Sequence, residues 1–419
     1  MSPETQAPSG ALSHLKVLDL SRVLAGPWAS QMLADMGADV IKIEHPDRGD
    51  DTRAWGPPYW RDPAGDGVES AYFLCANRNK KSVALDMATP EGQRLIRELA
   101  LQSDVLIENF KVGGLAKYGL DYATLSALNP RLVYCSITGF GQTGPYAQRP
   151  GYDFMVQGMG GLMSLTGVPD GDEGAGPMKV GVALTDVLTG LHAVVGVLAA
   201  LAWRAQSGLG QWVDLALLDV QVSCLANQAL NYLVTGESPS RLGNAHPSIV
   251  PYQSFPTADG EIILAVGNDS QFAAFCHVAG RPEWAVDPRF VTNAARVANR
   301  KTLVPLLRQT TVHRTTDAWI LALEAANVPC GPINTLAQVF ADPHVQARGL
   351  RLDLPHGVSG TAPGVASPLR FSRTPVQYRW AAPPLGAHTE VVLSTLTPQT
   401  PQTPQAAEAF STPQRAGNV

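Results

Sequence analysis

The sequence predicts an α/β protein with two domains: a large domain built on a parallel sheet and a smaller α+β domain. Three observations lead to this prediction. Short apolar runs alternate with helical segments between residues 16 and 137, at the spacing of strand–helix–strand units. After residue 250 the pattern changes to a hairpin followed by helices. The 419 residues also exceed the size of one ordinary hydrophobic core.

The expected strands of the large domain are short apolar runs bounded by polar residues. They are Lys16–Leu20, Asp39–Glu44, Lys81–Asp86, Asp104–Glu108, Arg131–Ile137 and Gly210–Leu217. Helices are expected at Pro27–Met36, where proline occupies the first turn, at Pro90–Leu101, which is amphipathic, and from the last strand to about Leu233. Residues 46–70 are rich in Gly, Pro and Asp and predict a loop. Ligands bind at the carboxyl ends of parallel strands, so the site is expected there.

The smaller domain is predicted from a different pattern. Residues Pro251–Val266 indicate a hairpin with its turn at Asp259-Gly260. Helices are expected near residues 271–279, 301–309 and 316–326. The expected limits are 14–224 for the first part of the large domain, 225–345 for the small domain and 346–395 for a segment returning to the large domain. Residues 1–13 and 396–419 are expected to be disordered, the latter because of its Pro-Gln-Thr repeats.

Charge and composition argue against several function classes. A net charge of −5 disfavours non-specific binding to nucleic acid, but it is compatible with a local basic pocket for a phosphorylated ligand. Five scattered cysteines, with no C-x-x-C pair, indicate neither a metal site nor disulfides, and they fit reduced thiols in the cytoplasm. The N-terminus lacks the features of a signal or transit peptide. The apolar run 187–203 approaches the length of a membrane span, but His192 and two glycines within it favour a buried core helix.

Asp186 lies at the start of that apolar run. A carboxylate bordering so much apolar sequence is costly unless it is partnered or used. Local sequence favours a helix cap, since Asp before Val-Leu-Thr-Gly-Leu suits that position. The alternative is a nucleophile, because a carboxylate held ionised in a dry site can attack a substrate.

Residues Gly139–Gly144 match G-x-G-x-x-G directly after a predicted strand. A dinucleotide-binding fingerprint needs a helix next, but Pro145 and Pro150 follow. A nicotinamide or flavin cofactor is therefore not expected. The glycines instead predict a tight loop near a ligand.

Cations and an aromatic ring follow the predicted strand ends. Asn109, Phe110 and Lys111 offer amide hydrogen bonds, a stacking face and a positive charge, which suit a nucleotide-bearing ligand. Lys117 and the pair Lys80-Lys81 add further charge near the same edge. Taken separately these lysines fit a solvated surface; taken together they indicate a pocket for an anionic ligand.

Two further residues have open alternatives. Asp153 is expected either to cap the helix starting at Phe154 or to assist chemistry across a cleft. His246 lies in a glycine-bearing loop that either lends backbone N–H groups to an oxyanion or simply connects the domains.

The motifs together resemble the class III (CaiB/BaiF-type) CoA-transferases over about residues 14–395. The segments that carry the resemblance are Leu18–Pro27, Gly37–Glu44, Asn79–Ser82, Glu108–Lys111, Asn129–Tyr134, Gly139–Pro145 and Gly181–Asp186. Residues 243–255 are most similar to the succinyl-CoA:dicarboxylate (glutarate or hydroxymethylglutarate) members.

The resemblance implies a Rossmann-like large domain, an interlocked homodimer, CoA thioesters as substrates and no permanently bound cofactor. It makes Asp186 the nucleophile, which forms an aspartyl–acyl anhydride and then an aspartyl–CoA thioester. It also implies a set of CoA contacts: Leu24, Ala25, His45, Leu85, Asn109, Phe110, Lys111 and Lys117. Lys117 stands where relatives usually have Arg, so bidentate phosphate binding is not expected.

Tyr152 and Asp153 match positions that line the family's substrate site, and His246 is a further candidate there. Arg22 is the candidate for the second carboxylate of a dicarboxylic acid, with a structural ion pair as the alternative. The alternative activity is an α-methylacyl-CoA racemase, but Tyr152 stands where racemases carry a histidine. A non-catalytic acyl-CoA-binding protein is the third possibility, and an intact Asp186 argues against it.

Overall fold

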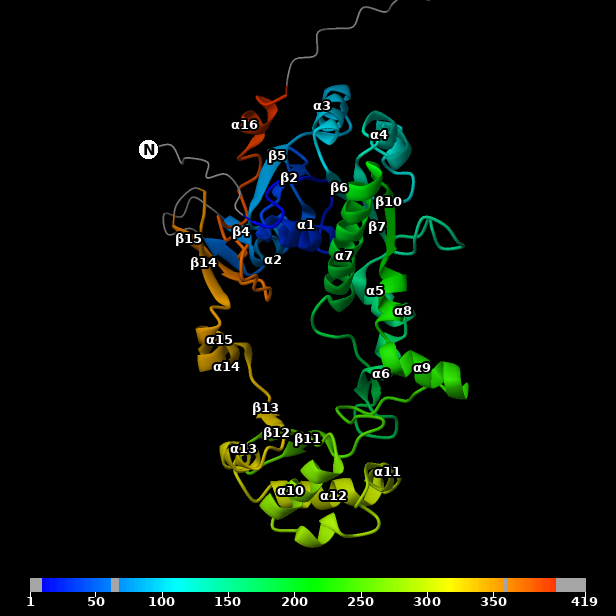
Figure 1. Cartoon of the computed structure of the whole chain (residues 1–419), viewed down its shortest axis with the longest axis vertical. Helices are drawn as coiled ribbons and strands as arrows, with labels where there is room; N and C mark the ends of the chain where they lie inside the picture. The colour runs from blue at the N-terminus through cyan, green and yellow to red at the C-terminus, as the bar shows by residue number, and fades with distance from the viewer. Residues whose placement is uncertain (1–9, 62–67, 358–359, 397–419) are drawn as a thin grey trace, which may run out of the picture.

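The structure is a computed structural model that describes residues 10–61, 68–357 and 360–396. These residues form a large body around a six-stranded sheet and a smaller body around a three-stranded sheet, joined by two stretches of chain on opposite sides (Figure 1). Residues 10–13, from the predicted disordered lead, form a turn in which the Leu12 N–H donates to Met36 O at 2.9 Å. Leu396, the first residue of the predicted disordered tail, donates its N–H to Leu393 O at 3.1 Å, and the rest of both predicted disordered ends lies outside the described residues.

The large sheet is parallel throughout, as predicted. Its strands are β1 (Lys16–Asp19), β2 (Asp39–Glu44), β5 (Lys80–Ala84), β6 (Val105–Glu108), β7 (Val133–Thr138) and β10 (Trp212–Ala216). Their order across the sheet is β10-β7-β6-β1-β2-β5. The chain therefore builds outward from β1 to β5, then returns to β6 on the other side of β1. The order reverses between β1 and β6, and loops leaving their carboxyl ends diverge there to leave a crevice.

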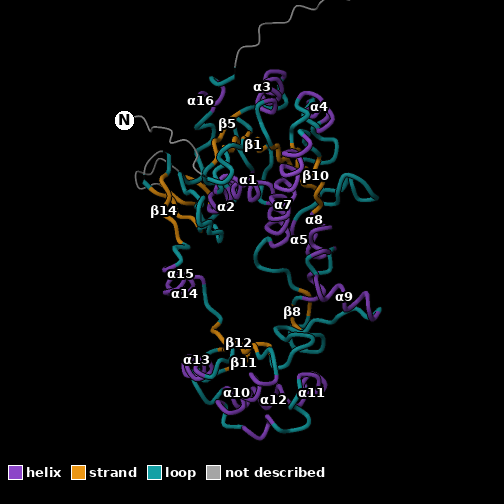
Figure 2. The backbone as a smooth tube through the Cα atoms, viewed as in Figure 1, coloured by secondary structure: helices purple, strands orange, loops and turns teal. Residues whose placement is uncertain are grey.

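Helices cover both faces of this sheet (Figure 2). One face carries α1 (Ala25–Asp35) and α7 (Leu184–Ser207); the other carries α3 (Pro90–Leu101), α4 (Tyr122–Leu128) and α16 (Thr389–Leu393). Neighbouring strand residues point to opposite faces, so Val17 and Val105 pack with α1 and α7, whereas Leu18 and Leu106 pack with α3 and α4. Burial on both faces explains why these strands are apolar throughout.

Among the described residues, α7 is the one helix that is long and apolar enough to cross a membrane by length and composition. Of its most apolar stretch of 18 residues, 39% is buried inside the structure. Its buried side meets α1 closely, since a Cβ on Gly190 would lie 2.8 Å from Ala25 O. Its other side exposes Leu191, Val195 and Trp203. The expectation of a buried core helix therefore holds for the side of α7 that meets α1, whereas the second side is exposed in the described part of a single chain.

The small body confirms the predicted hairpin. Strands β11 (Tyr252–Pro256) and β12 (Glu261–Ala265) are antiparallel, and β13 (Cys330–Pro332), which was not predicted, pairs with β12. The surrounding helices are α10 (Asp269–Val278), α11 (Asn293–Ala298), α12 (Arg300–Thr311) and α13 (Thr316–Ala325). They enclose a separate core that includes Phe255, Phe275 and Trp319. The proposed boundaries at residues 225 and 345 stay a prediction.

The last described segment packs against the large body. Strands β14 (Arg351–Pro355) and β15 (Thr361–Val365) form a hairpin. Beyond it, Asn79 at the start of β5 donates from Nδ2 to Gln377 O and accepts the Arg379 N–H at Oδ1, each at 2.8 Å. The Ala84 N–H donates to Thr389 Oγ1 at 2.9 Å, so this segment lines the β5 edge.

Several short elements were not predicted, because tertiary contacts rather than periodicity stabilise them. The expected loop at residues 46–70 contains η1 (Asp51–Ala54), β3 (Tyr59–Arg61) and β4 (Val68–Ser70), and α2 (Ala71–Ala76) follows it. The expected long helix after β10 is two helices, α8 (Leu217–Ser223) and α9 (Ala226–Thr235). The helix expected to start at Phe154 is α5 (Asp153–Met159). The other elements are η2 (Ala116–Tyr118), α6 (Leu162–Leu165), β8 (Gly167–Val168), β9 (Gly176–Pro177), η3 (Pro282–Ala285), α14 (Leu336–Ala341) and α15 (Pro343–Ala347).

Candidate active site

The loops after β1 and β6 are clamped together at the point where the strand order reverses. The Arg22 N–H donates to Asn109 Oδ1 at 2.8 Å, and Asn109 Nδ2 donates to Arg22 O at 2.7 Å. Asn109 was expected to contact CoA through its amide. In the structure the amide holds the Arg22 backbone, which fixes the wall of the crevice.

A first cavity of about 170 Å³ opens at this edge of the sheet. Its walls come from the loop after β1, the loop after β6, the loop after β7 and the first turn of α7. The lining includes Arg22, Leu24, Ala25, Asn109, Phe110, Lys111, Gly139, Arg149, Tyr152 and Asp186. The fold thus brings the predicted nucleophile together with seven residues predicted to contact CoA or substrate from distant parts of the chain.

A second cavity of about 460 Å³ adjoins the first and shares Arg22, Phe110 and Lys111 with it. It lies at the carboxyl ends of β2 and β5. The other lining residues include Leu20, Lys42, His45, Arg48, Asp50, Leu85, Met87, Lys117 and Tyr118. Its cations and apolar floor suit an anionic ligand that also carries a flat ring.

Asp186 lies in the first turn of α7 but does not cap it. The N-cap position is Ala183, which makes no side-chain capping bond, and the Asp186 carboxylate accepts no hydrogen bond from any described residue. The helix-cap interpretation of Asp186 is therefore wrong. Backbone N–H groups of the described residues therefore do not hold this carboxylate ionised.

Asp153 performs the capping instead, from a different helix. Its Oδ1 accepts the Thr185 N–H at 2.8 Å and the Asp186 N–H at 3.3 Å, while Oδ2 accepts from Gln157 Nε2 at 2.7 Å. Asp153 does not cap its own helix α5, whose N-cap is Tyr152. It therefore places Asp186 by holding the start of α7.

Burial and a like charge both act on Asp186. Burial, followed by the nearby Asp153 carboxylate, raises the pKa of Asp186 to about 7. Its carboxyl group is thus close to half ionised at neutral pH. A carboxylate with a raised pKa is more basic and more nucleophilic than one in water, and no described residue hydrogen-bonds or pairs with this one.

The glycine-rich loop after β7 carries Asp153 into place. A Cβ on Gly139 would lie 2.6 Å from the Gly151 Cα, so both residues must be glycine for the two ends of the loop to touch. The first helix after this motif is α5, beginning at Asp153. The prediction of a tight loop rather than a dinucleotide fingerprint agrees with this geometry.

Helix α1 starts beside the same cavity with Leu24 as its N-cap, and within the described part of the chain no side chain caps its first turn. Leu24 and Ala25 both line the cavity. Free N–H groups and the helix dipole at this end favour negative charge. The arrangement can therefore stabilise an anion that forms near Asp186.

Two residues of the site were missed from the sequence. Tyr72, on α2, lies close enough that Asp186 contributes, after burial, to raising its pKa to about 12. Arg149 lines the first cavity with its guanidinium over the rings of Tyr146 and Phe140, 4.6 and 5.3 Å from the ring centroids. It forms no ion pair with any residue that the structure describes. No local pattern marked either residue, since both depend on loop packing.

Arg22 shows features of both interpretations left open for it. Its Nη1 lies 3.3 Å from Asp51 Oδ2, and its guanidinium lies 5.1 Å from the Phe110 ring centroid. Its Nε has no hydrogen-bond partner in the described residues. Arg22 is thus partly paired and keeps donors for a ligand between the two cavities.

His246 is not brought to either cavity within this chain. Its N–H donates to Tyr252 O at 3.0 Å, its ring packs on that of Tyr252, and its Nδ1 accepts the Ser248 N–H. It lies in the loop leading to the small body. Across the described ranges, no group of three or more His, Cys, Asp or Glu side chains could hold a metal ion, and the five thiols are free.

The fold and the site define a class: an α/β enzyme with two adjoining cavities near the reversal of its sheet. The first cavity is lined by the Asp186 carboxylate, to which no described residue donates a hydrogen bond. The family model described as CoA-transferase family III matches residues 12–389, and the chain belongs to this family. It is a CoA-transferase, with CoA thioesters as its substrates.

Individual relatives agree with this assignment. The chain is 54% identical over 385 residues to a succinate–glutarate CoA-transferase of Agrobacterium fabrum, covering 92% of this chain and 95% of the relative. It is 44% identical over 384 residues to the human succinyl-CoA:glutarate CoA-transferase, covering 91% and 85%. A solved CaiB/BaiF family protein from Brucella suis superimposes with a TM-score of 0.82 at 51% identity, covering 93% of this chain and 100% of the other.

Proposed function

We propose that the protein transfers CoA from succinyl-CoA to glutarate or a similar dicarboxylic acid, with Asp186 as the nucleophile. The observation that carries this proposal is the Asp186 carboxylate, which faces a cavity without a hydrogen-bond partner among the described residues. Relatives named for succinate, succinyl-CoA and glutarate support the choice of substrates.

The chemistry passes through two kinds of aspartyl intermediate. The Asp186 carboxylate attacks the succinyl thioester carbonyl, which gives an aspartyl–succinyl anhydride and CoA thiolate. The thiolate attacks the aspartyl carbonyl, which releases succinate and leaves an aspartyl–CoA thioester. The acceptor carboxylate attacks that thioester, giving a new anhydride and thiolate. The thiolate then attacks the acceptor's carbonyl, so glutaryl-CoA leaves and the Asp186 carboxylate is restored.

The surroundings of Asp186 suit these steps. Both anhydride and thioester hydrolyse, so the site has to limit water, and Leu24, Ala25 and Leu217 supply apolar walls. Each carbonyl attack creates an oxyanion, which the uncapped start of α1 can stabilise. The raised pKa of Asp186 gives a better nucleophile than an ordinary aspartate.

The two cavities divide the CoA molecule between them. We assign the nucleotide end to the second cavity, where His45, Leu85, Lys111 and Lys117 lie, with Phe110 as a stacking face. The thioester end then reaches the first cavity beside Leu24, Ala25 and Asp186. Asn109 acts by holding the loop between the two ends.

The acid site is assigned to the remaining part of the first cavity. Arg22 binds the far carboxylate of the dicarboxylic acid, using donors that Asp51 leaves free. Tyr152 lines this part of the cavity and Asp153 positions Asp186. His246 joins the site only if a second chain brings it there.

We also propose an interlocked homodimer in the cytoplasm. The two bodies are joined by stretches of chain on both sides, so that the backbone forms a ring through which we propose that a second chain passes (Figure 1). Leu233 and Val234 on α9 are 72% and 80% exposed, and the outer face of α7 is apolar. Such surfaces favour association. Light scattering on the purified protein tests the dimer: a monomeric mass at micromolar concentration contradicts it.

One assay tests the proposed reaction. The protein is incubated with succinyl-CoA and a panel of mono- and dicarboxylic acids, and the product thioesters are identified by mass spectrometry. Glutaryl-CoA is expected, together with an Asp186–CoA adduct that hydroxylamine or borohydride traps. A protein that forms no new thioester, but exchanges deuterium at Cα of a 2-methylacyl-CoA, is a racemase instead.

A further inference from the structure

The loop between β1 and α1 carries a backbone conformation that its side chain does not favour. Val23 has φ +71°, in the left-handed region where a β-branched residue is an outlier. Such a conformation persists only where surrounding groups enforce it. The loop is also functional in position, because Arg22, Leu24 and Ala25 on either side line the first cavity.

Asp50 is the group that enforces this conformation. Both of its carboxylate oxygens lie 3.3 Å from the Val23 nitrogen and accept its N–H. Oδ1 also accepts the Thr52 N–H at 3.0 Å and the Thr52 hydroxyl at 2.8 Å. Asp50 lies in the segment after β2, so the side chain that holds Val23 belongs to a separate part of the chain.

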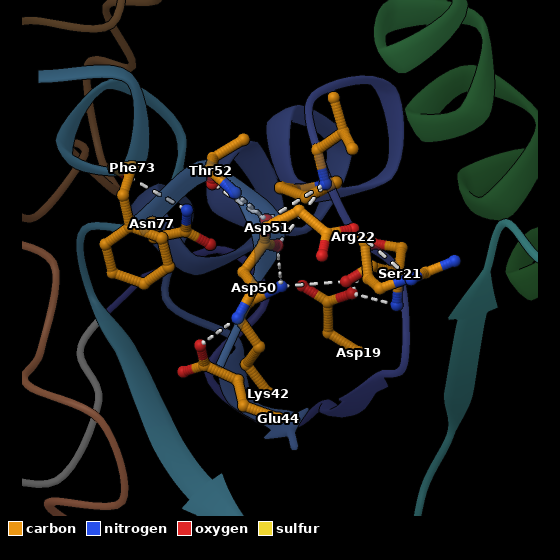
Figure 3. A network of polar contacts seen from close by, with 12 residues as sticks. Asp19, Ser21, Arg22, Lys42, Glu44, Asp50, Asp51, Thr52, Phe73 and Asn77 are labelled. Atoms are coloured by element: carbon orange, nitrogen blue, oxygen red, sulfur yellow. Dashed lines mark hydrogen bonds and ion pairs between the residues drawn. The ribbon is translucent and has the colours of Figure 1, made fainter. Parts of the chain in front are cut away.

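Lys42 forms an ion pair with Asp50 and thereby fixes its position. Its Nζ lies 2.9 Å from Asp50 Oδ2, and both side chains are almost fully buried (Figure 3). The same ammonium donates to Ser21 O at 2.7 Å. Burial would raise the pKa of Asp50, but Lys42 and Thr52 keep it below its usual value, so the carboxylate stays ionised.

Three consecutive residues of the loop are therefore held by side chains from elsewhere. Lys42 holds Ser21, Asn109 holds Arg22, and Asp50 holds Val23. Since a buried ion pair is often no more stabilising than apolar packing, its value here lies in the geometry that it fixes.

We infer that Asp50 and Lys42 are positioning residues: they hold Val23 left-handed and thereby set the Arg22–Ala25 wall between the CoA end of the site and Asp186. Measurements of turnover with succinyl-CoA rest on the proposed function, whereas measurements of CoA affinity do not. The positioning role of Asp50 and the proposed function can therefore fail separately.

Asp50→Asn tests the inference because it keeps the shape but removes an acceptor. The Asn amide offers only one oxygen to the Val23 N–H. Its NH₂ also faces a second donor in either orientation, the Lys42 ammonium at the Oδ2 position or the Thr52 N–H at the Oδ1 position. We expect kcat/KM with succinyl-CoA and the affinity for CoA, measured by calorimetry, to fall at least about tenfold, since small misplacements in an active site have effects of this size.

Val23→Gly provides a readout that a merely structural role would not change. Glycine adopts positive φ without steric cost, so the loop no longer needs Asp50 to hold it. In the Asp50→Asn background, adding Val23→Gly should recover at least about threefold of the lost kcat/KM and CoA affinity. The double variant is compared with Val23→Gly alone.

Asp35→Asn is the matched control, because Asp35 is also buried and paired, with Arg78, but lines neither cavity. It should lower the melting temperature while kcat/KM and CoA affinity stay within about twofold of wild type. If Asp50→Asn does not fold, Thr52→Val, which removes one donor to Asp50, should give a smaller loss that Val23→Gly again relieves.

Two results overturn the inference: Asp50→Asn with wild-type CoA affinity, or no recovery on adding Val23→Gly. A wild-type protein that binds CoA but transfers none contradicts the proposed function, while the calorimetric comparison still decides the role of Asp50.

Discussion

Asp153 Oδ1 accepts the backbone N–H of Asp186 at 3.3 Å, so one carboxylate holds the residue that carries the other. The contact has two effects on Asp186. It anchors the start of α7 and thereby the position of the side chain. It also places a like charge nearby, which adds to burial in raising the pKa of Asp186 to about 7.

The first prediction concerns pH. The attacking form of Asp186 is the carboxylate, so kcat/KM for succinyl-CoA should rise between pH 6 and 8 with an apparent pKa of about 7. Asp153→Asn keeps an oxygen that accepts the Asp186 N–H but removes the like charge. Its acidic limb should therefore move to lower pH. A pH–rate profile of both proteins checks this, and superimposable limbs contradict it.

The second prediction concerns Asp186→Asn. Loss of the nucleophile should reduce transfer on the order of 10³-fold or more. A carboxyl whose folded pKa lies above its unfolded value stabilises the fold at low pH, and that contribution is lost as pH rises through the folded pKa. Here the loss runs from about pH 4 to 7.

Asn resembles the protonated form, so Asp186→Asn should be more stable than wild type at pH 8, by up to about 4 kcal/mol, with a smaller gain at pH 5. Urea denaturation at both pH values measures the gain. Equal stability of the two proteins at pH 8 shows that Asp186 is not held in a dry site.

The third prediction concerns Lys117, on the wall of the second cavity. Lys117→Ala should raise KM for succinyl-CoA about tenfold with little change in kcat, because one charge-assisted contact to a phosphate is lost. Lys117→Arg should keep or lower KM, since guanidinium binds phosphate bidentately. Lys301→Ala, an exposed lysine on α12, is the control. A KM increase as large in the control rules out a specific role for Lys117.

The fourth prediction concerns selection of the acid. Arg22→Gln should raise KM for glutarate at least about tenfold, and leave a monocarboxylic acid of similar length little affected. Arg149→Gln is the comparison, because Arg149 lines the same cavity and forms no ion pair with a described residue. If only Arg149→Gln loses glutarate selectivity, the distal-carboxylate site belongs to Arg149.

Sequence alone predicted the strands of the large sheet and the location of Asp186 at the start of an apolar helix, because both depend on local patterns. Apolar runs such as Val105–Glu108 specify a strand by themselves, and the G-x-G-x-x-G loop could be separated from a dinucleotide fingerprint by its prolines. Asp186 could be singled out because a charged residue borders an apolar helix.

The rest of the site depends on contacts between residues far apart in the chain. The role of Asp153 as the cap of α7 cannot be seen from its neighbours, since its partners are 32 and 33 residues away. Tyr72 lies on α2, a short helix without a clear period. The hydrogen bonds from Val23 to Asp50 join two loops, and neither loop's sequence indicates that Val23 has a positive φ.

The hydrogen bonds between β5 and the last described segment have a consequence for biosynthesis. Asn79 and Ser82 take partners from Gln377, Arg379 and His388, about 300 residues later in the chain. On the ribosome, this edge of the sheet therefore stays open until about 300 further residues have been translated. An open edge strand is a template for aggregation, so the nascent chain is vulnerable throughout that interval.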